Sequence, residues 1–140
     1  MPQVMRADVT SEVIAIAQLI ALVKDDRCGA VVTFTGDVRN HDGGKEVKTL
    51  TYEIYPSAGA QIALITAAVI ADSDVIKVAL SHRYGEILIG ETAFAVAVSA
   101  PHRESAFEIA SALVNEIKAK LPIWKHQVFA DGTDEWVNTA

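Results

Sequence analysis

Five basic residues of this chain have the types and positions needed to bind an anionic ligand. Arg39 opens a glycine-rich turn after a predicted strand, and His102 and Arg103 open a predicted helix, where free backbone N–H groups attract anions. Lys118 and Lys125 lie near the end of that helix and on the strand that follows it. Arginine grips phosphate through paired hydrogen bonds, and a partly desolvated lysine beside other cations can exchange protons near neutral pH. The set predicts an anion site served by a lysine acid or base.

The spacing of two of these residues limits how they can cooperate. Arg103 and Lys118 lie fifteen positions apart on one predicted helix, and ~1.5 Å per residue separates them by roughly 22 Å. One small ligand cannot bridge that distance within a single chain. If both residues serve one site, a second copy must supply one of them across a dimer interface. The alternative is that Lys118 stabilises the end of the helix dipole and Lys125 is a surface charge.

Other common chemistries find little support in the sequence. The single cysteine, Cys28, cannot form an internal disulfide or a multi-cysteine metal site. The histidines show no HxH or HxxxH spacing for zinc. Neither a glycine-rich phosphate loop nor a GxSxG nucleophile elbow occurs. We therefore predict no metal and no cofactor, and we interpret Cys28 as an ordinary thiol.

The composition bounds the class of protein. A chain of 140 residues with 51% hydrophobic and 21% charged residues is typical of a globular protein, and we predict one domain over 1–140. The net charge of −6 argues against a nucleic-acid binder. No apolar run reaches the ~20 residues of a membrane helix, and the first residues do not resemble a secretion signal. We expect a cytoplasmic protein without nucleic-acid or membrane partners.

Hydrophobic periodicity and turn residues predict the elements that must position the basic residues. Helices are expected over residues 11–24, 56–71 and 101–120. Strands are expected over residues 30–38, 47–55, 75–82, 86–89, 92–99, 123–130 and 135–137. The strands at 30–38 and 47–55 are expected to pair as a hairpin around the 39–44 turn. Because strands and helices mix without strict alternation, the predicted class is α+β, with a mixed, largely antiparallel sheet and about three helices.

Several separated motifs make the chain similar to the large, catalytic subunit of molybdopterin synthase. The match runs in order from about residue 28 to 137 at consistent spacing. The motifs are GAVVTFTGDVRNH over 29–41, YEIYP over 52–56, HRYGE over 82–86 followed by Gly90 and Glu91, SAPHRESAF over 99–107, KAKLPIWK over 118–125 and EWV over 135–137.

The resemblance implies a fold, an activity and partners. The expected fold is of the α/β hammerhead type with added β structure. The expected activity converts cyclic pyranopterin monophosphate into molybdopterin by installing the two sulfurs of the dithiolene. The expected sulfur source is a small ubiquitin-like subunit whose C-terminal glycine carries a thiocarboxylate. Two large subunits are expected to form a central homodimer within a heterotetramer.

The resemblance also implies roles for particular residues. Lys118 and Lys125 match the catalytic lysines, and both are expected to contact the substrate. The other expected substrate contacts are Asp37, Val38, Arg39, His102, Arg103, His126 and Gln127. Asp37 is acidic where related proteins often carry a basic residue, which favours a contact through its backbone. Cys28 matches no catalytic position, so the sulfur is expected to come from the partner.

A second hypothesis remains at this point. The chain could be a non-catalytic dimeric scaffold that binds a ubiquitin-like partner or a phosphorylated metabolite without turnover. Such a binder could keep Arg39 and Arg103 but would not need both Lys118 and Lys125. The pair of lysines therefore favours the enzyme.

Overall fold

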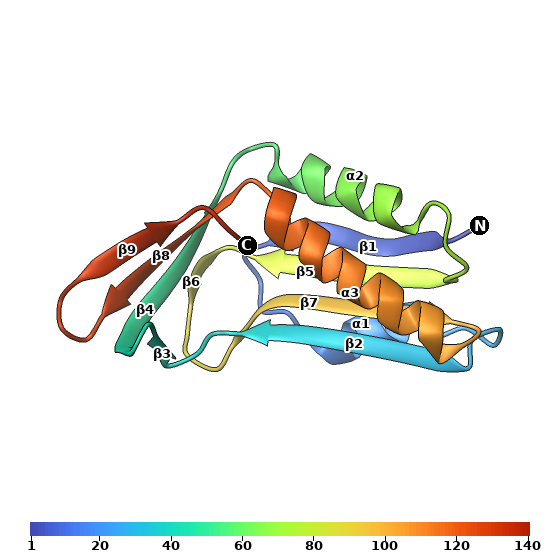
Figure 1. Ribbon diagram of the computed structural model, residues 1–140, viewed down its shortest axis with the longest axis horizontal. Coiled ribbons are helices and arrows are strands. Elements are labelled where there is room, and N and C mark those ends of the chain that lie inside the picture. Colours follow the sequence, from blue (N-terminus) through green and yellow to red (C-terminus); the bar gives the residue numbers. More distant parts are fainter.

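The computed structural model describes all 140 residues and contains two β-sheets and three α-helices (Figure 1). The first sheet has the strand order β1-β5-β7-β2. Its strands are β1 (Gln3–Thr10), β5 (Lys77–Arg83), β7 (Thr92–Ala100) and β2 (Ala30–Asp37). β1 and β5 run parallel, whereas β5–β7 and β7–β2 are antiparallel pairs. The predicted mixed sheet is confirmed.

The second sheet occupies the other end of the molecule (Figure 1). It has the order β3-β4-β8-β9, with β6 paired to β4, and all of its pairs are antiparallel. Its strands are β3 (His41–Asp42), β4 (Lys45–Ile54), β6 (Gly85–Ile87), β8 (Ile123–Phe129) and β9 (Asp134–Val137). The two sheets meet where β2 ends, and that junction is where the site is built.

Helices cover both faces of the first sheet. Helices α2 (Ala58–Ile70) and α3 (Arg103–Lys120) cover one face, and α1 (Ile16–Val23) covers the opposite face (Figure 1). No helix in the structure is both long and apolar enough to cross a membrane.

Large and small side chains alternate along the central strands, because the two faces of the sheet pack against different helices. Val78 and Leu80 of β5 belong to the large core under α2 and α3. Ala79 between them, with Ala95 and Ala97 of β7, packs against α1. Successive strand residues point to opposite faces, so small residues on one face let α1 pack close to the sheet. On the other face, the buried side chains of α3 belong to the large core, so α3 lies over β7 and β2 with both of its ends fixed.

The predicted hairpin of residues 30–38 with 47–55 is wrong. β2 pairs with β7, and β4 pairs with β3, β6 and β8. Gly43 and Gly44 both have positive φ, and they fold the 39–44 turn into a two-residue hairpin loop between β3 and β4. Because the chain turns at this loop, β4 lies in the second sheet. β2 is instead the edge strand of the first sheet, where it pairs with β7, which is buried along nearly its whole length.

Three further boundaries differ from the predictions. The parallel edge strand β1 was not predicted, because its sequence QVMRADVT is too polar to stand out as a strand. Helix α1 begins at Ile16 and not at residue 11, since Thr10 Oγ1 accepts a hydrogen bond from Glu12 N and caps a turn instead. Helix α2 begins at Ala58, two residues after Pro56.

Candidate functional site

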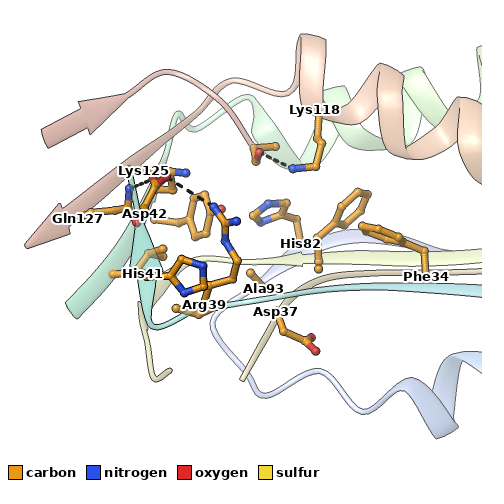
Figure 2. Close-up of a pocket in the computed structure, with 16 residues that line it drawn as sticks. Phe34, Asp37, Arg39, His41, Asp42, His82, Ala93, Lys118, Lys125 and Gln127 are labelled. Atoms are coloured by element: carbon orange, nitrogen blue, oxygen red, sulfur yellow. Dashed lines mark hydrogen bonds and ion pairs between the residues drawn. The ribbon is translucent and has the colours of Figure 1, made fainter. Parts of the chain in front are cut away.

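A cavity of about 250 Å³ lies at the junction of the two sheets (Figure 2). Strand ends from both sheets and the last turn of α3 contribute to its wall. Six of the residues expected at the site line it: Asp37, Val38, Arg39, Lys118, Lys125 and Gln127. The remaining lining residues are Phe34, Gly36, His41, Asp42, Leu50, Tyr52, His82, Ala93, Phe94 and Ala140.

The end of α3 and the strand after it carry the two lysines to this cavity. Lys118 lies in the last turn of α3, and the chain then turns at Leu121 into β8. Lys125 and Gln127, two positions apart on β8, both line the cavity, as strand alternation requires. Trp124 instead packs edge-on against Tyr55, with ring centroids 6.1 Å apart. Strand alternation thus places Lys125 at the cavity and Trp124 on the other side of β8.

The surroundings of Lys118 favour loss of its proton. Its Nζ donates a hydrogen bond to the main-chain oxygen of Ala140 at 3.3 Å (Figure 2). Desolvation of the ammonium, and secondly the positive charge of Lys125, lower the pKa of Lys118. The charge of Lys125 therefore acts on Lys118, as predicted for a partly desolvated lysine beside another cation.

The wall near Lys118 is neutral and was missed by the sequence reasoning. His82 is 1% exposed and packs against Tyr52 and Phe94, with ring centroids 4.8 and 5.3 Å away. Its burial, and to a smaller extent the charge of Lys118, lower the pKa of His82 to about 4. Nδ1 donates to the main-chain oxygen of Arg83 at 2.8 Å, and Nε2 has no partner. Burial also raises the pKa of Tyr52 to about 12.

Arg39 and Asp42 stand at the rim of the cavity. Arg39 Nη2 lies 3.5 Å from Asp42 Oδ1, and the guanidinium is well exposed. Asp42 Oδ2 accepts a hydrogen bond from Gln127 Nε2 at 2.7 Å. This hydrogen bond, then the positive charges of Lys125 and Arg39, lower the pKa of Asp42 despite its partial burial. Nothing in the sequence pattern marked Asp42 as part of the site.

The side chains of Asp37 and Val38, unlike the exposed guanidinium of Arg39, are held by contacts within the protein. Thr92 Oγ1 donates to Asp37 Oδ1 at 2.8 Å, and Figure 2 shows this carboxylate pointing away from the two lysines. Val38 is 5% exposed and is part of the core. The Asp37 carboxylate therefore does not face the two lysines.

His102, Arg103 and His126 do not line the cavity of this chain. His102 and Arg103 lie at the opposite end of α3, on an exposed surface. His126 points to the other side of β8, where its ring stacks on Trp136 at 4.3 Å and its Nε2 donates to Asp134 Oδ2 at 2.9 Å. The alternation that directs Lys125 and Gln127 into the cavity excludes His126 from it.

Two features concern the metal and thiol chemistries considered from the sequence. No group of three or more His, Cys, Asp or Glu side chains gathers where it could hold a metal ion. Cys28 is a free, partly exposed thiol outside the cavity. The fold and the site together define an α+β protein with a cavity suited to an anionic ligand and bordered by two lysines.

Comparison with known proteins places the chain in one family. The family model described as MoaE protein matches residues 9–120. Molybdopterin synthase catalytic subunit 1 of Mycobacterium tuberculosis is 34% identical over 129 residues, covering 91% of this chain and 87% of that protein. The molybdopterin synthase catalytic subunit of Bacillus subtilis is 36% identical over 133 residues, covering 94% of this chain and 84% of that protein.

Solved structures agree with the sequence comparisons. The crystal structure of molybdopterin synthase from Staphylococcus aureus matches with a TM-score of 0.85 and 32% identity, covering 94% of this chain and 96% of that chain. The MoaE protein from Burkholderia ambifaria matches with a TM-score of 0.80 and 26% identity, covering 99% and 90%. The chain belongs to the MoaE family of molybdopterin synthase catalytic subunits, as its motifs indicated.

Proposed function

We propose that this protein is the catalytic subunit of a molybdopterin synthase. It transfers sulfur from the thiocarboxylated C-terminus of a small ubiquitin-like subunit to cyclic pyranopterin monophosphate, and forms the molybdopterin dithiolene. The observation that carries the proposal is the pair Lys118 and Lys125 at one cavity, with Arg39 at the rim. The family membership supports the same activity.

The electrostatics of the cavity suit the binding of a phosphorylated substrate. In our proposal Arg39 holds the anionic end of the substrate, since a guanidinium can bind two phosphate oxygens at once. The positive charges of Lys118 and Lys125 add to this attraction. The neutral aromatic wall, which includes Tyr52 and Phe94, gives a flat heterocycle an apolar surface to pack on.

The lysines supply the acid–base chemistry in this proposal. As sulfur adds to the substrate and the cyclic phosphate opens, negative charge develops on oxygen, and an ammonium group stabilises it. The lowered pKa of Lys118 makes this residue a better proton donor and acceptor near neutral pH than a free lysine. The acyl carbon of the partner loses its sulfur to the substrate and gains an oxygen from water, so the partner leaves as an ordinary carboxylate.

The proposal includes a second copy of the chain. His102 and Arg103 lie at the far end of α3 from Lys118, so they can reach this substrate only at the cavity of a neighbouring subunit. We propose a central homodimer in which each cavity receives His102 and Arg103 from the other subunit. A small ubiquitin-like subunit bound to each large subunit completes the heterotetramer.

The proposal assigns no sulfur chemistry to this chain's own thiol. Cys28 does not line the cavity, and the lining contains no other sulfur atom. A cytoplasmic location is part of the proposal, and a free thiol is compatible with that reducing compartment.

Reconstitution tests the proposed function. The purified protein is mixed with thiocarboxylated small subunit and cyclic pyranopterin monophosphate, and molybdopterin is measured. Product formation that depends on the thiocarboxylate supports the proposal. Absence of product, with intact binding of the small subunit, would contradict it and favour the non-catalytic scaffold.

A further inference from the structure

We infer that Asp42 is a positioning residue for the proposed reaction. Its carboxylate fastens the β3–β4 hairpin to strand β8 through Gln127, and so holds Arg39, three residues earlier in the chain, at the rim of the cavity. The inference rests on the proposed function for its effect on turnover, and on the contacts of this chain for its structural part.

The hairpin that follows Arg39 is too small to hold its own position. β3 contains only His41 and Asp42, which pair with Glu46 and Lys45 of β4. The connecting residues Gly43 and Gly44 have φ of 58° and 79°, which glycine adopts at low cost but which give no side-chain contacts. β4 itself is held by its pairing with β8 from Val47 onward and by contacts of Lys45 with Asp131 and Thr133. The placement of β3, and of Arg39 before it, therefore depends on the side-chain contacts of β3.

The contact on the cavity side is the one between Asp42 and Gln127. Gln127 is 3% exposed, and its Nε2 donates to Asp42 Oδ2 at 2.7 Å and to Glu135 Oε1 at 2.9 Å. A primary amide has two N–H donors, so both are used within the protein. In this arrangement the two N–H groups of Gln127, on β8, link the hairpin with β9, and the amide oxygen is the atom left for a ligand.

The other oxygen of Asp42 faces Arg39. Asp42 Oδ1 lies 3.5 Å from Arg39 Nη2, and the arginine side chain is 66% exposed. An ion pair this exposed fixes little by itself. Among the side-chain contacts that β3 makes with the rest of the molecule, the hydrogen bond from the buried Gln127 amide is therefore the main anchor.

Two substitutions at Asp42 separate the anchor from the charge. Asp42→Ala removes both, and we expect the KM for cyclic pyranopterin monophosphate to rise about tenfold with kcat within about twofold, because a lost binding contact raises KM. Asp42→Asn keeps an oxygen that accepts from Gln127, so its KM should stay within about threefold of the unsubstituted protein. Glu46→Gln, which changes an exposed carboxylate of the same hairpin, is the control and should change neither value.

An independent measurement tests the anchor without turnover. Amide hydrogen exchange of residues 39–44 in the substrate-free protein should accelerate in Asp42→Ala and in Gln127→Leu, and remain near the original rate in Asp42→Asn. The Asp42→Ala and Gln127→Leu effects should not add in the double variant, since both break one contact.

The outcomes separate this inference from the proposed function. Unchanged exchange in Asp42→Ala would overturn the anchor, whatever the activity. Equal rises in KM for Asp42→Ala and Asp42→Asn would overturn it as well, because the charge would then be the operative property. If the unsubstituted protein makes no molybdopterin, the proposed function fails, while the exchange rates still test the anchor.

Discussion

The two ends of helix α3 place the predicted basic residues in different surroundings. At the C-terminal end, Lys118 shares a cavity with Lys125, beside the buried ring of His82. At the N-terminal end, His102 and Arg103 lie on an exposed surface. The helix has 18 residues, so about 27 Å separates its ends at ~1.5 Å per residue. One chain therefore carries two parts of the proposed site, a helix length apart, and cannot bring them together.

The largest expected effect is at the cavity end. Lys118→Ala and Lys125→Ala should each reduce molybdopterin formation by about 100-fold or more, because positioned acid–base groups contribute on that order. Lys120→Ala is the matched control, since Lys120 lies in the same last turn but is exposed and pairs with Glu116. Thermal unfolding checks that each variant is folded. Normal turnover in both cavity variants would refute the assignment.

The buried His82 ring, at the cavity end of α3, makes the free energy of unfolding depend on pH. His82 binds its proton near pH 6.5 when unfolded, but burial lowers its pKa to about 4 in the folded protein. The unfolded chain therefore binds more protons between these values, so stability is complete above about pH 6.5 and falls as the pH approaches 4. At about pH 5 this loss amounts to about 2 kcal/mol.

Urea unfolding of matched variants measures this loss. His82→Phe should flatten the decline between about pH 7 and pH 5, because phenylalanine has no proton to bind. His102→Ala, at the exposed end of α3, should leave the decline as it is in the unsubstituted protein. An equal decline in all three proteins would show that the two ends do not differ in this respect.

A smaller effect is expected at the N-terminal end of α3. Arg103→Ala should raise the KM for the substrate about tenfold, because a charge-assisted hydrogen bond to phosphate is lost. Its exposed side chain predicts an unchanged melting temperature. Glu108→Gln, one turn along the same exposed surface, serves as control and should leave KM unaltered. An unchanged KM in Arg103→Ala would show that the N-terminal end of α3 does not contact the substrate.

The smallest expected effect is that of salt. Arg39 is exposed, and exposed charges are screened beyond ~8 Å at physiological ionic strength. The apparent affinity for the anionic substrate should therefore fall a few-fold between low and physiological salt, measured by titration at fixed pH. Arg103→Ala should show a weaker dependence. An affinity that does not change with salt would point to apolar contacts as the main source of binding.

Local patterns in the sequence predicted much of the fold. Apolar β-branched residues marked β2 and β7, and the 3.6-residue period marked α3, so these elements lie close to their expected bounds. Strand pairing could not be predicted in the same way. The partner of β2 depends on the two-residue loop at Gly43 and Gly44 and on the burial of β7, and both are properties of the assembled sheet.

The site could be predicted in part. The motif around Lys118 and Lys125 predicted both residues of the cavity pair. The roles of His82 and Asp42 depend on contacts with residues far away in the chain, such as the hydrogen bond between Asp42 and Gln127. No periodicity or spacing encodes such a contact, so these residues emerged only from the structure.

Subunit mixing tests whether two chains build each active site. Arg103→Ala and Lys118→Ala proteins are each assayed alone and then after exchange of subunits, at a substrate concentration well below KM so that both defects lower the rate. A mixed dimer has one cavity with both defects and one with neither, so random exchange should restore roughly a quarter of the original activity. Recovery to that level is the predicted result. No recovery, with exchange of subunits demonstrated, would contradict a shared site.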